Sequence, residues 1–88
     1  MMKENRLRRL LNEGKPSVST RMWGTWPLFT ECVGATGNFD YTEFVAEYAP
    51  FSQCDLENMP RAAELYDMGP MIKMDLQNRA YVAQKAVA

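Results

Sequence analysis

The spacing of apolar residues along this 88-residue chain alternates between the period of a helix and the period of a strand. Leu7, Leu10 and Leu11 recur at the i, i+3, i+4 spacing of one helix face. After this leader helix, the pattern predicts a strand followed by a helix three times over. Such alternation is typical of parallel strands joined by right-handed crossovers. The expected fold class is therefore α/β, either a doubly wound sheet or a (β/α)8 barrel. We predict a leader helix over 3–12 and strand–helix units over about 17–36, 41–67 and 71–87, all in one domain.

Proline and capping residues set the expected ends of these elements. Pro27 suits the first turn of a helix that runs to about Ala35. That helix is expected to turn Phe29, Cys32 and Val33 inward. Strands are predicted at 17–23, 41–48 and 71–75. Ser52 and Asp55 form a plausible capping box. Because Pro60 cannot donate to a helix already under way, a regular helix is expected to begin near Met59.

Composition narrows the class of protein. No stretch of the chain approaches the length of a membrane-spanning apolar helix, and no apolar signal-peptide core follows the basic N-terminus. We therefore expect a cytoplasmic protein without a membrane partner. Six of the ten basic residues lie within the first 21 positions. Since no aromatic residues are interleaved with them, we expect a solvated helix face that pairs with acids elsewhere, and no nucleic-acid partner.

The sequence contains no histidine and only two cysteines. The lack of histidine excludes a Ser-His-Asp or Cys-His site, and any histidine metal ligand, within this chain. Cys32 and Cys54 are too isolated for a disulfide framework, and we expect both to be reduced and mostly buried. Acid–base chemistry within the chain would have to use carboxylates, lysine, tyrosine or water.

Several short stretches, in this order, resemble the HpcH/HpaI aldolase and citrate lyase family of pyruvate- and phosphoenolpyruvate-binding barrels. The family's basic leader helix ends in a Gly-Lys-Pro-like turn, and a Gly-Phe-Asp-like turn precedes its second strand. That strand ends in Asp-x-Glu-His-Gly/Ala-Pro, an Arg-Ala-Ala helix follows, and the third strand carries an arginine. The matching stretches here are Gly14-Lys15-Pro16, Gly37-Asn38-Phe39-Asp40, Val45-Ala46-Glu47-Tyr48-Ala49-Pro50, Arg61-Ala62-Ala63 and Met71-Ile72-Lys73-Met74.

The resemblance implies the leader helix and first three βα units of a (β/α)8 TIM barrel, incomplete in this chain. It also implies a class II, metal-dependent aldolase or lyase of 2-keto acids such as pyruvate. A divalent metal (Mg²⁺, Mn²⁺ or Co²⁺) would hold the 2-keto acid, through ligands that lie beyond residue 88 in the family. We expect the chain to be inactive alone and the whole protein to be a homo-oligomer.

The chain departs from the family at the residues that carry the chemistry. Tyr48 stands in place of the histidine and Val45 in place of its aspartate, while Lys73 replaces the arginine. Lysine keeps the positive charge but lacks the planar fork of the guanidinium. Among these family positions, only the glutamate is retained, as Glu47. The candidate catalytic residues are therefore Lys73, Glu47 and Tyr48, with no metal ligand among them. Strand alternation predicts that Glu47 and Lys73 meet at the C-terminal rim.

Each candidate also has a structural interpretation. Glu47 and Lys73 could form an ion pair that has no chemical role, with Tyr48 as packing. Arg21 could bind a substrate carboxylate or lie on the surface. Trp23 and Trp26 could line a pocket mouth, although packing beneath a helix is the expectation. The whole protein could likewise be a divergent, non-catalytic barrel that binds a ligand or a partner subunit. The chain by itself could also self-associate through its open strand edges.

Overall fold

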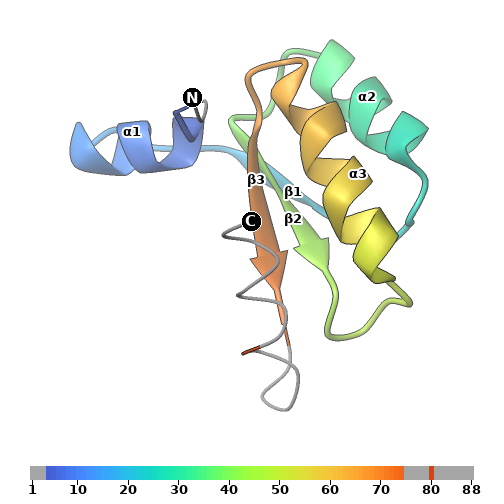
Figure 1. The fold of residues 1–88 in the computed structure, drawn as a ribbon. Helices are drawn as coiled ribbons and strands as arrows, with labels where there is room; N and C mark the ends of the chain where they lie inside the picture. Colours follow the sequence, from blue (N-terminus) through green and yellow to red (C-terminus); the bar gives the residue numbers. More distant parts are fainter. Residues whose placement is uncertain (1–3, 75–79, 81–88) are drawn as a thin grey trace.

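The computed structural model describes residues 4–74 and 80 of the chain. Helices and strands alternate along it, as predicted for an α/β fold (Figure 1). The elements are α1 (Arg6–Asn12), β1 (Ser19–Met22), α2 (Pro27–Ala35), β2 (Tyr41–Val45), α3 (Gln53–Glu64) and β3 (Gly69–Lys73). The helix predicted over 77–87 lies, apart from Ala80, outside the described residues.

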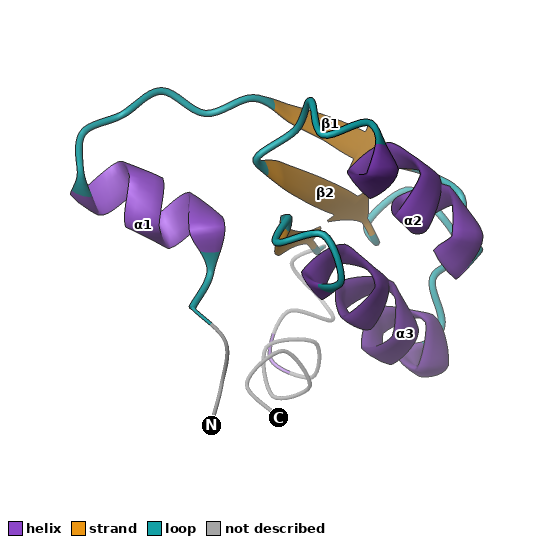
Figure 2. Cartoon of the chain, turned by 90° about the horizontal axis from the view of Figure 1, so that it is seen from above, coloured by secondary structure: helices purple, strands orange, loops and turns teal. Residues whose placement is uncertain are grey.

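The three strands form one parallel sheet in the order β1-β2-β3. Arg21 pairs with Glu43, and Glu43 pairs in turn with Met71. Two residues further along, Val45 pairs with Lys73. Helices α2 and α3 lie together on one side of this sheet, and α1 lies on the other side, away from them (Figures 1 and 2). Consecutive parallel strands with crossover helices on one side are the expected start of a (β/α)8 barrel.

The core lies between the sheet and the two helices. Met22 and Phe44 point to it from the sheet, and Met59 and Ala63 from α3, all nearly inaccessible to solvent. Because side chains alternate along a strand, the neighbours of Met22 and Phe44 in sequence face the opposite side of the sheet. That opposite face carries Arg21 and Glu43, so the charged residues of the sheet are kept apart from the core.

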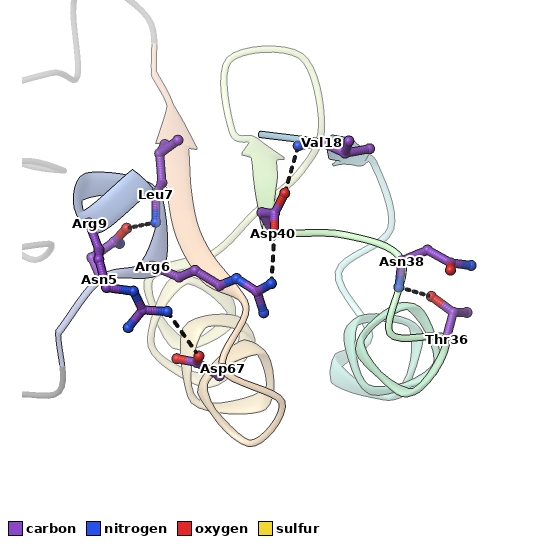
Figure 3. A network of polar contacts seen from close by, with 9 residues as sticks. All are labelled: Asn5, Arg6, Leu7, Arg9, Val18, Thr36, Asn38, Asp40 and Asp67. Carbon is purple, nitrogen blue, oxygen red and sulfur yellow. Dashed lines mark hydrogen bonds and ion pairs between the residues drawn. The ribbon is translucent and has the colours of Figure 1, made fainter. Parts of the chain in front are cut away.

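Polar contacts hold α1 to the N-terminal ends of the strands (Figure 3). Asn5 caps α1 by accepting hydrogen bonds from Leu7 N and Arg8 N, and its amide donates to Pro70 O at 3.3 Å. The guanidinium of Arg6 lies 2.8 Å from Asp40, and that of Arg9 lies 3.4 Å from Asp67. The prediction that the basic helix pairs with acids elsewhere is confirmed for these two arginines.

The expected start of the third helix near Met59 is wrong. Helix α3 begins at Gln53, and Pro60 lies inside it. The capping box between Ser52 and Asp55 is present, with Ser52 N donating to Asp55 Oδ2 at 2.8 Å. The cap satisfies N–H groups at the helix start, and the buried Leu56 and Met59 pack that part of the helix onto the core. These contacts offset the one hydrogen bond that a proline removes.

Helix α2 has the predicted range but a different buried face. Thr30 is its buried residue, whereas Phe29 and Cys32 are exposed and only Val33 packs against the core. Cys54 is exposed as well, so the expectation of two buried cysteines is wrong. Thr30 Oγ1 donates a hydrogen bond to Met59 Sδ at 3.7 Å, between α2 and α3. In the described part of the chain, no helix is long and apolar enough to cross a bilayer.

Candidate functional site

The candidate site lies where β2 and β3 end. Lys73 is the last residue of β3, and its carbonyl accepts a hydrogen bond of 3.1 Å from Glu47 N. This bond lies just beyond the Val45–Lys73 pair, so the backbone places Glu47 beside Lys73. Their side chains meet, with Lys73 Nζ 3.7 Å from Glu47 Oε2. The predicted meeting of Glu47 and Lys73 at the C-terminal ends of the strands is confirmed as a contact.

Tyr48 lies in the turn after β2, because the strand ends at Val45 and not at Tyr48 as predicted. The turn is closed by hydrogen bonds from Tyr48 N and Ala49 N to the carbonyl of Val45. It brings the Tyr48 ring beneath Lys73 Nζ, which lies 4.6 Å from the ring centroid. This distance is within the range of a cation–π contact.

Trp23 completes the site from the neighbouring strand. It directly follows β1, and its ring stacks on that of Tyr48 with the centroids 6.0 Å apart and the planes at 20°. The expectation that Trp23 and Trp26 pack beneath a helix is wrong, because they are 54% and 57% exposed. The signal in the sequence was the position of Trp23 at the end of the strand predicted over 17–23, since the ends of parallel strands gather at one edge of a sheet.

Arg21 and Glu43 form a second ion pair on the same face of the sheet. Arg21 Nε donates to Glu43 Oε2 at 3.2 Å across the β1–β2 pairing. The side chain of Arg21 is largely exposed, whereas that of Glu43 is mostly covered. A substrate carboxylate that reached Arg21 would therefore have to share its guanidinium with Glu43.

The two ion pairs make this face polar but nearly neutral. Lys73 and Glu47 are both partly exposed, and exposed pairs of this kind stabilise a protein by only about 0–1 kcal/mol. An incoming anion can therefore compete with Glu47 for Lys73 at small cost. The site can therefore bind a negatively charged group beside the ammonium of Lys73 and a planar group beside the two aromatic rings.

The described part of the chain supplies no conventional proton relay to the site. Val45, which stands in place of the family's aspartate, is apolar and 1% exposed. Its side chain can neither orient a neighbouring proton donor by a hydrogen bond nor accept a proton from it. Among the described residues, the side-chain contacts of Tyr48 are made by its ring.

The described residues also do not fit a metal site. No three histidine, cysteine, aspartate or glutamate side chains in residues 4–74 and 80 are grouped so that they could hold a metal ion. Of the described residues, Glu43 and Glu47 carry the carboxylates on this face, and each is paired with a cation. Hard divalent cations need several oxygen ligands, which this part of the chain does not bring together.

Comparison with known proteins shows the fold. No protein-family model and no curated protein sequence matches the chain. An HpcH/HpaI aldolase from Desulfitobacterium hafniense is 20% identical with a TM-score of 0.78, over 93% of this chain and 31% of that one. The citrate synthase SbnG is 23% identical with a TM-score of 0.77, over 92% of this chain and 32% of that one.

A Glu-to-Gln variant of SbnG is 26% identical with a TM-score of 0.68, over 75% of this chain and 29% of that one. The chain thus spans about a third of the length of the solved structures that it matches. The resemblance to the HpcH/HpaI aldolases inferred from the sequence is confirmed by this likeness, as is the α/β fold of a partial barrel.

Proposed function

We propose that this chain is part of a lyase that acts on a 2-keto acid and breaks or forms a carbon–carbon bond next to a pyruvate unit. The observation that carries the proposal is the contact between Lys73 and Glu47. It places a cation at the C-terminal ends of the strands, and strand alternation puts Lys73 on the face opposite to that of the core residues Phe44 and Ile72. The structural likeness to an HpcH/HpaI aldolase supports the same reaction class.

Lys73 is the residue that offsets negative charge on the substrate. Cleavage of the bond between the α- and β-carbons of a 2-keto acid leaves an enolate, whose negative charge is shared with the α-carbon but lies mostly on the oxygen. A positioned ammonium stabilises such a charge more in the transition state than in the ground state, which accelerates the reaction. The charge of Glu47 keeps the ammonium near the ends of the strands, and Arg21 binds the substrate carboxylate in competition with Glu43.

The divalent metal implied by the resemblance would polarise the keto oxygen of the substrate. The described residues supply no ligand set for it, and the roles given to Lys73, Glu47 and Arg21 do not use it. Its ligands would have to come from other parts of the protein.

An assay of pyruvate release tests this proposal. The whole protein that contains this chain is incubated with a panel of 2-keto-3-deoxy acids and with Mg²⁺, Mn²⁺ or Co²⁺ in turn. We expect release of pyruvate from at least one substrate and a loss of about 10²-fold or more in the Lys73→Met variant. The proposal fails if no substrate yields pyruvate although bound metal is measured in the same sample.

A second candidate function is a barrel that binds a ligand or partner subunit without catalysis. The buried, apolar Val45 favours it, because the residue beside Tyr48 that should support proton transfer has no ionisable group. The Lys73→Ala variant separates the two functions. A binding protein would keep every measurable activity of the whole protein when Lys73 is removed, whereas a lyase would lose pyruvate release.

A further inference from the structure

The ammonium of Lys73 has two partners, and neither alone holds it in one place. The 3.7 Å between Lys73 Nζ and Glu47 Oε2 exceeds the length of a hydrogen bond, so the carboxylate attracts the ammonium without fixing its direction. A lysine side chain is also long and flexible. An arginine can be fixed in one direction by the paired hydrogen bonds of its planar guanidinium, but a lysine ammonium cannot. A precise anion site at this position needs a further restraint.

The ring of Tyr48 supplies that restraint. Lys73 Nζ lies over the ring at 4.6 Å from its centroid, which places the ammonium between a carboxylate and an aromatic face. The ring is held in turn by Trp23, whose plane is inclined by only 20° to it. Both aromatic residues are more than half exposed, so burial of apolar surface in the core does not explain their arrangement.

We propose that Tyr48, supported by Trp23, is a positioning residue that directs the ammonium of Lys73 toward an anionic substrate through its ring and not through its hydroxyl. The inference rests on the proposed function, because it assigns Tyr48 a role in the 2-keto acid site. It also links two departures from the family pattern: the lysine at position 73 and the tyrosine at position 48 contact each other. Since a cation–π contact needs only the face of a ring, phenylalanine can replace tyrosine here.

Nuclear magnetic resonance of the 88-residue chain tests the contact directly. Protons above the face of an aromatic ring are shielded, so the ε-methylene protons of Lys73 should resonate upfield of those of the exposed Lys15. We expect this shift to persist in Tyr48→Phe and to disappear in Tyr48→Leu. It should shrink in Trp23→Leu and stay unchanged in Trp26→Leu. The last variant is a matched control, because Trp26 is as exposed as Trp23 but pairs with Phe29 instead.

Titration of the same variants with pyruvate tests the consequence. We expect Tyr48→Leu to weaken pyruvate binding about two- to five-fold, the range that an exposed cation–π contact contributes, and Tyr48→Phe to bind as the natural sequence does. Equal losses in Tyr48→Phe and Tyr48→Leu would assign the effect to the hydroxyl and overturn the inference. So would an unshifted Lys73 resonance in the natural sequence.

The Lys73→Met variant separates this inference from the proposed function. If Lys73→Met binds pyruvate as well as the natural sequence does, the proposed role of Lys73 fails, and the positioning role of Tyr48 fails with it. If Lys73→Met loses binding while Tyr48→Leu keeps both binding and the upfield shift, the inference alone is overturned. Loss of binding in Lys73→Met, together with about two- to five-fold weaker binding in Tyr48→Leu and unchanged binding in Tyr48→Phe, supports the inference.

Discussion

The carboxylate of Asp40 joins α1 to the start of the sheet, with Oδ1 lying 2.8 Å from the guanidinium of Arg6. Its other oxygen accepts a hydrogen bond of 2.9 Å from Val18 N (Figure 3). Asp40 thus ties together the leader helix, the segment before β1 and the start of β2. Its position at the N-terminal ends of the strands, opposite to Lys73, is where the residues of a barrel usually serve stability.

Asp40→Ala is predicted to lower the free energy of unfolding by about 1–2 kcal/mol, because a charge-assisted hydrogen bond and an ion pair are lost together. Asp40→Asn should lose less, since its amide oxygen can still accept from Val18 N. Urea denaturation measures both variants. Glu57→Ala, an exposed change on α3, is the control and should cost less than about 0.5 kcal/mol. Equal stability of Asp40→Ala and Glu57→Ala would contradict the role given to Asp40.

Gly34→Ala is predicted to destabilise the chain by about 1–3 kcal/mol, although alanine favours helices more than glycine does. A Cβ at position 34 would lie 2.7 Å from ring atoms of Tyr66 and 2.8 Å from its Cβ. These atoms lie near the backbone of Tyr66 and cannot move away without shifting α2 against the end of α3. Thermal unfolding measures the effect.

The matched control for Gly34→Ala is the same change in a Tyr66→Ala background. There the steric conflict is absent, and the higher helix propensity of alanine should make the change neutral or stabilising. A similar loss of stability in both backgrounds would show that Tyr66 is not the cause.

Glu13 gives a prediction for pH. A hydrogen bond from Lys15, reinforced by its charge, lowers the pKa of the Glu13 carboxyl below its ordinary value of 4.5. An acid whose pKa is lower in the folded chain adds stability above the unfolded pKa. That stability is lost as the pH falls through the folded pKa. The contribution is small because the side chain is exposed.

A titration of the Glu13 carboxyl carbon by nuclear magnetic resonance checks this prediction. In Lys15→Met the midpoint should rise toward the ordinary value, whereas in Lys73→Met, where the change lies far along the chain, it should stay unchanged. An unaltered midpoint in Lys15→Met would show that Lys15 is not the cause.

The order of the elements could be predicted from the sequence because periodicity and turn residues are local signals. The capping box at Ser52 and the leader helix were both predicted, and both are present. The helix around Pro60 was mispredicted since the penalty of a proline is local, whereas the burial of Leu56 and Met59 that outweighs it depends on the whole core. The same reason explains why Thr30, and not Phe29, faces inward.

The candidate site could be predicted only in part. Strand alternation, continued past the end of β2, predicted that Glu47 and Lys73 meet, and the hydrogen bond from Glu47 N to Lys73 O places them side by side. The contact between Tyr48 and Trp23 could not be predicted in this way. It depends on a turn after β2, closed by hydrogen bonds to Val45 O, and local sequence does not determine how such a turn orients a ring.

Binding of pyruvate to the whole protein that contains this chain, and to two lysine variants of it, tests the central claim most directly. Lys73→Met removes the ammonium beside Glu47 and Tyr48, and Lys15→Met removes an exposed ammonium beside Glu13. The chemical shifts of the residues around position 73 report the binding. Pyruvate should bind to the natural protein and to Lys15→Met with equal affinity, and it should not bind to Lys73→Met. Equal binding by all three proteins would contradict the assignment of Lys73 as the cation of a 2-keto acid site.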